Sequence, residues 1–437
     1  MKGTWLALPN WALPDFSLCD RFVMEIPLPD HVPDIRIDDY VYELPASLIA
    51  DYPLAQRDQS KLLISRNGQL SESRFHQIDQ FLDPDSMLIM NNTRVVQARL
   101  LFAKPSGARV EIFCLEPLYP VADMERALSQ GPAVEWKCLV GQAKKWKSGK
   151  LSHENQEVTF WAELIEKTDD HYRIRFSWKP DHLSFGQVLE LAGHTPLPPY
   201  IKRAAELTDR QTYQTVYARA RGSVAAPTAG LHFTEELFKK LRQKGLSCHA
   251  LTLHVGAGTF KPVSTETIGR HQMHQEQFHA GRPLIEAIAN HDGPLVAVGT
   301  TSMRTLESLY WTGVRLLAGD VPASGYVHLT QWFPYSWDGV VPSRAEAMRS
   351  ILDWLDREGL DGVHGETSLI IVPGYRFHVV DTLITNFHQP RSTLLLLVAA
   401  FTGPIWKDAY QYALDNGFRF LSYGDSCLFF KGGHADV

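Results

Sequence analysis

The stretch PLVAVGTTSMRTLES, residues 294–308, decides the fold class, because an apolar strand passes through a Gly-Thr-Thr-Ser turn directly into a helical pattern. The same order recurs at LTLHVGAGTF, residues 251–260, and at DTLITNFHQPRSTLLLL, residues 381–397. A fourth turn, VAAPTAG at residues 224–230, precedes a helix predicted over Glu235 to Lys244. Strands and helices in alternation predict a mainly parallel sheet that binds ligands at the carboxyl ends of its strands.

The region from about residue 95 to 187 has a different pattern, in which short β-rich runs such as ARVEIFCLE, VEWKCLV and HYRIRFSW are separated by turn residues. This spacing is typical of antiparallel sandwiches and barrels. Residues 1–36 lack periodicity and are predicted to be an N-terminal extension. Residues 317–364 are predicted to be a surface insertion that carries one amphipathic helix, RAEAMRSILDWLDREG.

The composition is that of a globular protein with two or three domains, since 437 residues are 44% hydrophobic and 21% charged. Five scattered cysteines without a CxxC pair favour neither a disulfide framework nor a thiolate zinc site, so we expect a cytoplasmic protein. The longest apolar run, Leu394 to Phe401, is far shorter than the ~20 residues of a membrane span. A net charge of −6 provides no bulk attraction to nucleic acid, although a local patch could bind one.

The four turns are predicted to line one crevice, because each carries small or polar residues where a strand gives way to a loop or helix. Taken singly, such a turn is more often only a capped connection that binds nothing. The predicted substrate-binding positions in these turns are Thr228, Ala229, Gly230, Gly256, Gly258, Thr300, Thr301, Ser302, Asn386 and Ser392.

Histidines supply the candidate catalysts, and His232, His254 and His388 each lie beside one of the turns. In MHQEQF, residues 273–278, His274 and Glu276 would share one face of an extended segment, where the carboxylate could tune the imidazole as a proton acceptor. One alternative for each histidine is a buried imidazole bonded to backbone. Another is a metal site, for which the candidate ligands are His271, His274, Glu276 and His279. A strand would put His271 and His274 on opposite faces, so we expect no metal.

Basic residues cluster in two segments, AKKWKSGK at residues 143–150 and YIKRAAELTDRQTYQTVYARARG at residues 200–222. Cations bind phosphates and interleaved tyrosines can stack on unpaired bases, as a single-stranded RNA loop requires. A solvated charged face is the alternative. The predicted RNA-binding residues in these segments are Lys144, Lys145, Lys147, Lys202, Arg203, Arg210, Arg219 and Arg221, with Tyr200, Tyr213 and Tyr217 between the latter.

Several long blocks resemble the S-adenosylmethionine:tRNA ribosyltransferase-isomerase family of the queuosine pathway. The similarity is collinear from about Asp39 to Leu428. The blocks are YELPASLIADYPLAQRDQSKLL, NNTRVVQARL, PLPPYIKR, DRQTYQTVYARARGSVAAPTAGLHFTEEL, TLHVGAGTFKPV, MHQEQF, GTTSMRTLES, VDTLITNFHQPRSTLLLLVAAFTG and FRFLSYGD.

The resemblance implies a fold and a reaction. The implied fold class is α/β, with a mainly parallel α/β/α domain (residues 37–94 and 188–437) interrupted by an inserted small antiparallel β-barrel (residues 95–187). The implied reaction transfers and isomerises the ribosyl part of S-adenosylmethionine onto 7-aminomethyl-7-deazaguanine in tRNA, giving epoxyqueuosine and releasing adenine and methionine. S-adenosylmethionine is a consumed co-substrate, and no cofactor is expected.

The blocks add Arg304, Tyr423 and Asp425 to the expected substrate-binding residues and Arg94 to the expected RNA-binding residues. The implied partner is the anticodon loop of tRNA, and we expect a monomer. The chain departs from the family pattern in its N-terminal extension, in the insertion at residues 317–364, at Phe278 where Tyr is common and at Met303 where Val is common. Two alternatives therefore stay open: a paralogous transferase that uses S-adenosylmethionine or another nucleoside on a small molecule, and a catalytically inactive tRNA-binding paralogue.

Overall fold

A computed structural model of the chain describes residues 31–104, 109–143, 146, 149–168, 171–256, 258, 262–322 and 325–432. Most of the predicted N-terminal extension lies outside these residues, and so do the predicted RNA-binding residues Lys144, Lys145 and Lys147. Within the described residues, no helix combines the length and the apolar character needed to cross a membrane.

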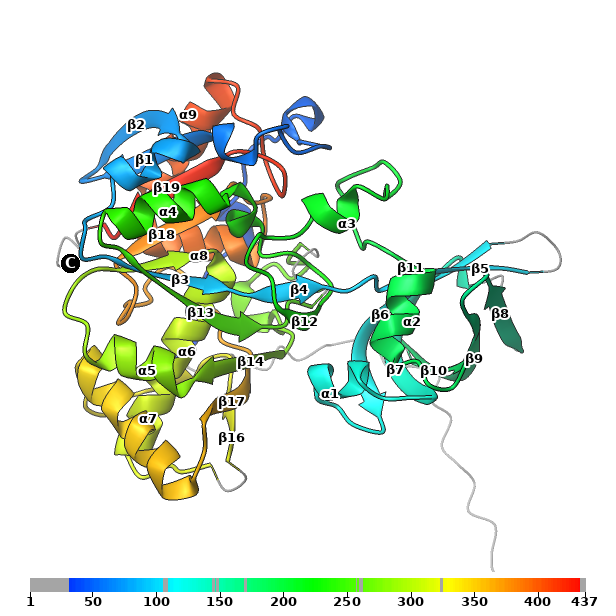
Figure 1. Ribbon diagram of the computed structural model, residues 1–437. Helices are drawn as coiled ribbons and strands as arrows, with labels where there is room; N and C mark the ends of the chain where they lie inside the picture. Colours follow the sequence, from blue (N-terminus) through cyan, green and yellow to red (C-terminus); the bar gives the residue numbers. More distant parts are fainter. Residues whose placement is uncertain are drawn as a thin grey trace, which may run out of the picture.

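A ten-stranded sheet forms the larger part of the molecule (Figure 1). Its strands, in spatial order, are β16 (Tyr326–Leu329), β17 (Gly362–Thr367), β14 (Glu276–Gly281), β13 (Ser247–Leu253), β3 (Met87–Asn91), β15 (Leu295–Val298), β18 (Thr382–Asn386), β19 (Ser426–Phe430), β1 (Lys61–Arg66) and β2 (Gln69–Arg74). The four central strands, β13, β3, β15 and β18, are parallel to one another. Both flanks include antiparallel pairs, namely β13 with β14, β14 with β17, β18 with β19 and β1 with β2. The sheet is therefore parallel at its centre and mixed at its edges.

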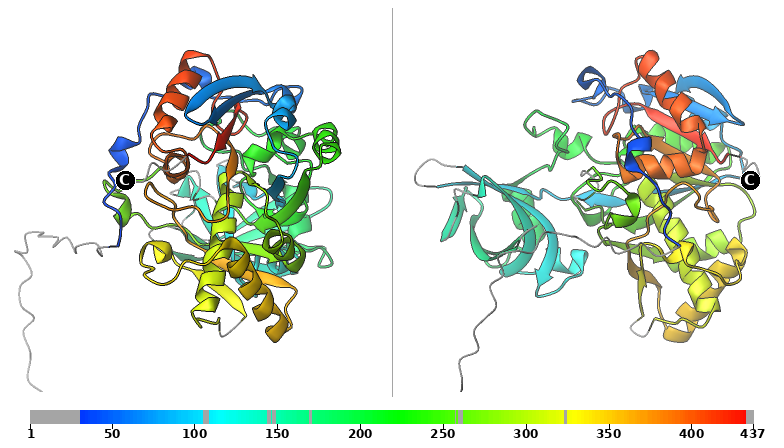
Figure 2. Two further views of the ribbon diagram at one scale, coloured as in Figure 1. Left: turned by 90° about the vertical axis from the view of Figure 1, so that its left-hand side faces the viewer. Right: turned by 180° about the vertical axis from the view of Figure 1, so that it is seen from behind.

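Helices cover both faces of this sheet, because its central strands are apolar on both sides (Figure 2). Leu63, Ile89 and Ala297 pack in the cluster that covers one face, beneath the helices α5 (Arg282–Ala289), α6 (Thr300–Leu317), α7 (Arg344–Glu358), α8 (Thr393–Thr402) and α9 (Ile405–Asp415). Neighbouring residues such as Leu62 and Leu88 pack on the other face with α4 (Glu235–Gln243) and η4 (Phe75–Gln80). The helix predicted before Gly245 is α4.

The segment predicted as a surface insertion is part of the core, so that prediction is wrong. Helix α7 packs against α5 and α6, and its Met348, Ile351 and Trp354 are fully buried. The same segment supplies β16 at the edge of the main sheet and leads into β17 beside it. The apolar residues of α7 recur every three or four positions, which shows a buried face but not the surface that it packs against.

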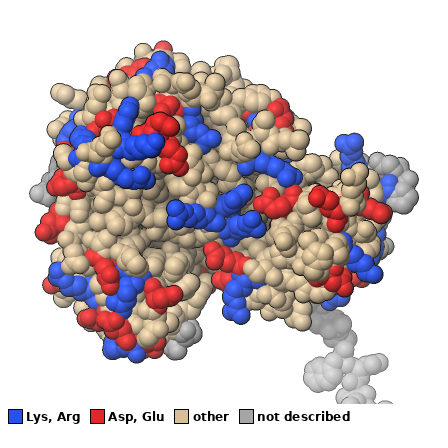
Figure 3. Space-filling view, viewed as in Figure 1, with Lys and Arg blue, Asp and Glu red and all other residues tan. Residues whose placement is uncertain are grey.

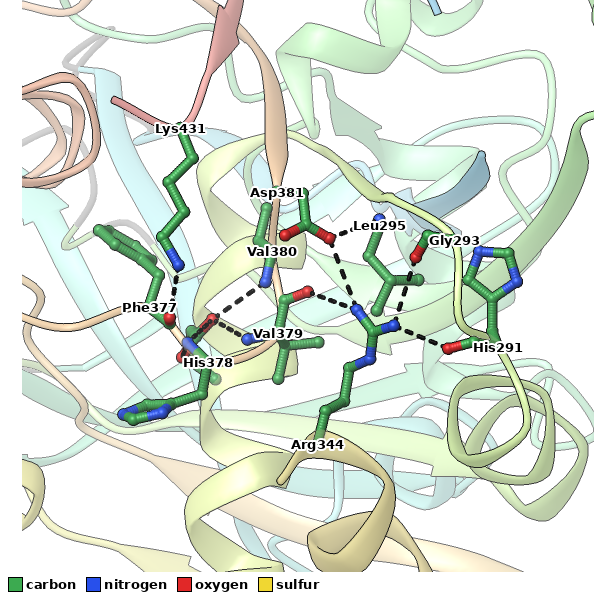
Figure 4. A network of polar contacts seen from close by, with 11 residues as sticks. His291, Gly293, Leu295, Arg344, Phe377, His378, Val379, Val380, Asp381 and Lys431 are labelled. Atoms are coloured by element: carbon green, nitrogen blue, oxygen red, sulfur yellow. Dashed lines mark hydrogen bonds and ion pairs between the residues drawn. The ribbon is translucent and has the colours of Figure 1, made fainter. Parts of the chain in front are cut away.

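Polar contacts tie α7 and the loop before β18 to the sheet edge that lies opposite the strand-end turns (Figure 4). Arg344, at the start of α7, donates to the carbonyl oxygens of His291 and Gly293 at 2.7 and 3.3 Å. Asp381 accepts from the backbone N–H of Leu295 at 2.9 Å. These contacts fix the starts of β15 and β18 relative to each other.

A second sheet, of seven strands, is antiparallel throughout and curled. In spatial order it contains β11 (Gly193–His194), β5 (Arg99–Ala103), β6 (Arg109–Tyr119), β7 (Ala133–Gly141), β10 (Tyr172–Lys179), β9 (Thr159–Lys167) and β8 (Lys150–Glu154). It wraps around Phe102, Trp136, Phe160 and Phe176, with α2 (Phe185–Ala192) packed against them. The curl brings β8 back into contact with β5, but no ladder joins these two strands in the described residues. The prediction of an antiparallel sheet in this region is confirmed in this coarse form.

Two features connect the sheets. One is a short parallel ribbon of β4 (Thr93–Val95) and β12 (Ala220–Ser223), which lies between them in Figure 1. The other is α1 (Met124–Leu128) of the curled-sheet region. The side chain of Gln277 on β14 accepts from the backbone N–H of Met124 at 3.1 Å and donates to the carbonyl oxygen of Ala122 at 2.9 Å. The curled sheet is thereby held beside the edge of the main sheet.

Candidate functional site

Three of the four predicted turns meet in one crevice, at the carboxyl ends of β15 and β18, whereas Gly256 and Gly258 of the remaining turn line neighbouring cavities. This sheet-edge cavity has a volume of about 700 Å³, part of which is open to solvent. Its walls come from three of the turns and include Thr228, Ala229, Gly299, Thr300, Thr301, Asn386, His388 and Ser392. Residues separated by more than 150 positions in the sequence are thus brought together.

Two further cavities lie next to it. The middle cavity, of about 1150 Å³, shares Thr300, Thr301 and Leu394 with the sheet-edge cavity. The inter-sheet cavity, of about 1180 Å³, shares Gly256, Gly258 and His274 with the middle cavity. The opposite part of its wall comes from the curled-sheet region and includes Leu118, Met124, Lys137 and Leu139. The three cavities are therefore neighbours in a row from the main sheet edge to the curled sheet.

The N-terminus of α6 faces the junction of the first two cavities. Its N-cap, Gly299, has φ +91°, a conformation that favours glycine, and the first helical hydrogen bond runs from the N–H of Met303 to the carbonyl of Gly299. The N–H groups of Thr300 and Thr301 precede that bond and have no partner within the helix. They are suited to bind a negatively charged or polar ligand.

Four buried polar atoms near these cavities have no hydrogen-bond partner among the described residues. They are Thr301 Oγ1, Asn386 Oδ1, Arg304 Nη2 and Thr265 Oγ1. Thr301 and Asn386 line the sheet-edge cavity, whereas Thr301, Arg304 and Thr265 line the middle cavity. Buried polar groups are almost always hydrogen-bonded in folded proteins, so this concentration indicates a site built for a polar ligand.

His388 is the candidate base held most firmly at the sheet-edge cavity. Its Nε2 lies 2.9 Å from Thr385 Oγ1, its backbone N–H donates to the hydroxyl of Tyr410, and its carbonyl accepts from the hydroxyl of Tyr42. Burial lowers the pKa of His388 to about 3, so the imidazole is neutral at pH 7 and can accept a proton. Its position at the cavity wall and its neutral form make it a candidate general base, and the pKa near 3 makes it a weaker base than a histidine that titrates near pH 7.

His232 and His254 occupy different surroundings. His232 is buried between Ser60 Oγ at 2.8 Å and Asn386 Nδ2 at 3.1 Å, and burial lowers its pKa to about 3. Both ring nitrogens are thus engaged, which favours a structural role. His254 lines the inter-sheet cavity with Nδ1 at 3.3 Å from Thr93 Oγ1, and burial lowers its pKa to about 4.

The predicted pairing of His274 with Glu276 is not found. His274 precedes β14 and is exposed, with its ring over Gly258, whereas Glu276 is buried in β14. Glu276 Oε2 accepts from Arg304 Nη1 at 2.5 Å and Oε1 accepts from the N–H of Gly256 at 3.3 Å. A buried carboxylate pairs with a cation that is buried beside it. The local sequence around Glu276 does not show that this cation is Arg304. Within the described residues, no three His, Cys, Asp or Glu side chains gather as a metal site requires.

Several other predicted substrate-binding residues have structural contacts instead. Ser302 Oγ donates to the carbonyl of Val298, and Asp425 accepts from the backbone N–H groups of Lys61 and Arg419. Tyr423 donates to Asp209, away from the three cavities. Ser392 lines the crevice and also caps α8, because its Oγ accepts from the N–H of Leu395. Gly230 does not line the crevice; a Cβ there would lie 1.9 Å from the hydroxyl of Tyr217.

The predicted RNA-binding residues divide into two groups. Arg94, Lys202, Arg219 and Arg221 are exposed, and Arg94 is the register partner of Arg221 in the β4–β12 ribbon. Figure 3 shows Lys and Arg side chains gathered over this ribbon.

The second group is engaged within the protein. Arg203 makes a two-point ion pair with the buried Asp209, and Arg210 donates to the carbonyls of Glu190 and Gly193. Tyr213 is fully buried, so it cannot stack on RNA bases as predicted.

The sequence patterns missed parts of the cavity walls. Gly299 could have been found, since a glycine directly before Thr-Thr-Ser at a strand end is a signal for a tight turn. Thr385 and Gln389 lie within the stretch at residues 381–397 and were passed over beside Asn386 and His388. The other missed residues have no local signal, because they come from other loops or from the distant curled sheet; they include Thr265, Arg270, Leu118 and Lys137.

Known proteins resemble the chain over most of its length. A family profile described as "Queuosine biosynthesis protein" matches residues 37–429. S-adenosylmethionine:tRNA ribosyltransferase-isomerase of Azoarcus sp. (strain BH72) is 38% identical over 405 residues, which are 92% of this chain and 99% of the relative. The enzyme of the same name from Syntrophomonas wolfei is 38% identical over 401 residues, 90% of this chain and 97% of the relative. A crystal structure of S-adenosylmethionine tRNA ribosyltransferase from Thermotoga maritima aligns with 26% identity and a TM-score of 0.43, covering 90% of this chain and 100% of the other.

Proposed function

The chain belongs to the queuosine biosynthesis family, whose curated relatives are named S-adenosylmethionine:tRNA ribosyltransferase-isomerase, and we propose that the three neighbouring cavities are the site of that reaction. The observation that carries this proposal is the row of three neighbouring cavities from the main sheet edge to the curled sheet, the first two of which are lined by residues with unpartnered buried polar atoms. Such a row offers room for S-adenosylmethionine and a tRNA nucleotide at the same time.

The polar atoms suggest how S-adenosylmethionine would lie. Asn386 Oδ1 at the sheet-edge cavity is a hydrogen-bond acceptor without a partner, and it suits the amino group of adenine. Thr300 and Thr301 at the junction would then lie beside the ribose, and the methionine part would extend into the middle cavity. The inter-sheet cavity, between the two sheets, would receive the modified base of tRNA.

The chemistry requires a neutral base beside the ribose. The sulfonium acidifies the hydrogens on C5′, and His388 would take one of them as a proton. The electron pair left on C5′ then forms a bond to C1′ as the bond between C1′ and adenine breaks. The aminomethyl nitrogen of the tRNA base bonds to C1′ and loses a proton as the C1′–O4′ bond breaks. O4′ finally bonds to C5′ and closes the epoxide, which breaks the C5′–sulfur bond and releases methionine. S-adenosylmethionine is consumed in these steps, and the expectation that no cofactor takes part is retained.

The arginines of the β4–β12 ribbon would bind the tRNA. Arg94 and Arg221 are exposed register partners, and like charges directly opposite each other destabilise a sheet unless an anion lies between them. Arg219 is exposed in the segment just before β12. The whole chain has a net charge of −6, but this local concentration of positive charge favours binding of a polyanion at the entrance between the two sheets.

Replacing Arg94 and Arg221 by Gln is expected to weaken tRNA binding about tenfold near 100 mM salt. The slope of log K against log salt concentration should become shallower by about 2, since each phosphate contact contributes roughly 0.9. The KM for S-adenosylmethionine should stay the same. Titrations at several salt concentrations measure the slope, and the matched control replaces two exposed lysines of α4, Lys239 and Lys240, by Gln. An unchanged slope in the arginine variant would move the RNA contact elsewhere, for example to Lys202 or to the undescribed Lys144, Lys145 and Lys147.

The activity itself is tested with the purified protein. We expect adenine release from S-adenosylmethionine that depends on tRNA carrying 7-aminomethyl-7-deazaguanine, detected by chromatography, with the ribosyl group recovered in the tRNA. Release without RNA would instead indicate a transferase that acts on a small molecule. RNA binding without adenine release would indicate an inactive paralogue.

Three further statements about the chain belong to the same proposal. The first is the division into an α/β domain and a barrel domain, supported by their separate hydrophobic clusters; the barrel cluster and its sheet extend through α2 and β11 to His194, beyond the predicted boundary at residue 187. The second is recognition of the anticodon loop by a monomer. The third is a cytoplasmic location, where both tRNA and S-adenosylmethionine are available.

A further inference from the structure

We propose that Arg304 binds the α-carboxylate of S-adenosylmethionine and thereby determines that the enzyme uses the intact amino acid end of this substrate. The inference rests on the proposed function, because it assigns one part of the substrate to the middle cavity. The Arg304 side chain donates hydrogen bonds to other groups of the protein, and its Nη2 has no acceptor among the described residues.

The guanidinium of Arg304 is held rigidly from two sides. Nε donates to the carbonyl of Leu369 at 3.0 Å, and Nη1 donates to Glu276 Oε2 at 2.5 Å. Glu276 is fixed in turn by its strand and by the N–H of Gly256. With two of its three nitrogens engaged, the plane and direction of the guanidinium are set before any ligand arrives.

The third nitrogen, Nη2, is buried and has no hydrogen-bond partner among the described residues. Arg304 is 5% exposed and lines the middle cavity. A charged donor left unpaired in a buried position costs stability, because it has lost water without gaining another acceptor. A ligand oxygen in the middle cavity would supply that acceptor.

Nearby groups complete a carboxylate site. Thr301 Oγ1 and Thr265 Oγ1 are also buried without partners and line the same cavity. The N-terminal turn of α6 provides the N–H groups of Thr300 and Thr301 and the positive end of the helix dipole. Arginine nitrogen, hydroxyl and backbone N–H are the donors that usually bind carboxylates.

The Arg304–Glu276 pair also accounts for the choice of an amino acid over a phosphate. The pair is neutral overall and presents a positive and a negative group side by side, as a zwitterion requires. A phosphate with nearly two negative charges would face Glu276 with little compensation. The amino acid end of S-adenosylmethionine carries one carboxylate and one ammonium on the same carbon and matches the pair.

The test compares two substrates in two proteins. The substrates are S-adenosylmethionine and its decarboxylated form, which keeps the sulfonium and adenosine but lacks the carboxylate. In the unaltered protein, we expect KM for the decarboxylated form to be at least thirtyfold higher. In Arg304→Gln, KM for S-adenosylmethionine should rise at least thirtyfold, while KM for the decarboxylated form should change less than threefold. Equal penalties for both substrates would overturn the carboxylate assignment and leave Arg304 with a structural role.

A second variant controls for misfolding, because Arg304→Gln leaves the buried Glu276 carboxylate without its cation. The double variant Arg304→Gln/Glu276→Gln removes both charges and keeps a hydrogen-bonding pair. It should show the same loss of discrimination between the two substrates, with a melting temperature closer to that of the unaltered protein. If the double variant still discriminates thirtyfold, the carboxylate binds elsewhere. Absence of adenine release from the unaltered protein with S-adenosylmethionine and tRNA would instead contradict the proposed function, so the two failures are distinguishable.

Discussion

His388→Gln is expected to lower adenine release at least a hundredfold while S-adenosylmethionine still binds. The reason is that a neutral imidazole at the wall of the sheet-edge cavity is the proposed acceptor of the C5′ proton, and loss of a general base typically costs 10²–10⁴ in rate. Glutamine keeps much of the side-chain volume and can still bond to Thr385. Rates of adenine release under saturating substrate and calorimetric binding of S-adenosylmethionine measure the two quantities separately.

Exchange of the C5′ hydrogen with deuterated solvent gives an independent readout, and we expect it to be lost in parallel. The informative comparison is with His254→Gln and His274→Ala, since both histidines line cavities of the same row. If His388→Gln retains near-normal exchange and one of the other two variants loses it, the base is that other histidine. The comparison also tests the original pairing of His274 with Glu276, which the geometry does not support.

Glu307→Ala is expected to have the largest effect on stability, lowering the free energy of unfolding by at least ~3 kcal/mol. Glu307 is fully buried in α6, and its carboxylate accepts from the backbone N–H groups of His378, Val379 and Val380 and from the hydroxyl of Tyr375. Burial raises the pKa of Glu307, and these hydrogen bonds oppose the shift. Alanine would leave three backbone donors without their acceptor, at about 1–3 kcal/mol each.

The loop that Glu307 holds is the one in Figure 4 that leads from Phe377 to Asp381 and into β18. A thermal melt should therefore show a drop of at least about 3 °C for Glu307→Ala and a smaller drop for Glu307→Gln, which keeps one acceptor oxygen. The matched control is Glu358→Ala, at an exposed position near the end of α7, which should melt within about 1 °C of the unaltered protein. A melt of Glu307→Ala that matches the control would show that the loop finds other acceptors.

Local patterns in the sequence were sufficient for the parallel centre of the main sheet and for the turns at its carboxyl ends. Strand β15 and helix α6 are separated only by Gly299, so their order alone places Thr300 and Thr301 at the edge of the sheet. The parallel arrangement then brings the end of β18, with Asn386 and His388, to the same edge. Periodicity predicted the curled antiparallel sheet in the same way, since alternation along a strand is a local property.

Contacts between distant segments were decided only by the tertiary structure. Glu276 was predicted to serve His274, two residues away, but it is bound by Arg304, 28 residues later in the chain. Tyr213 was predicted to meet RNA and is buried instead, and α7 was predicted to lie on the surface and packs on α5 and α6. In each case the sequence determined which chemical group was available, because residue type and local geometry are encoded locally. The partner of each group is decided by the tertiary structure. A buried charge needs a partner and a buried apolar face needs a packing surface, and the fold supplies both from distant segments that no local pattern specifies.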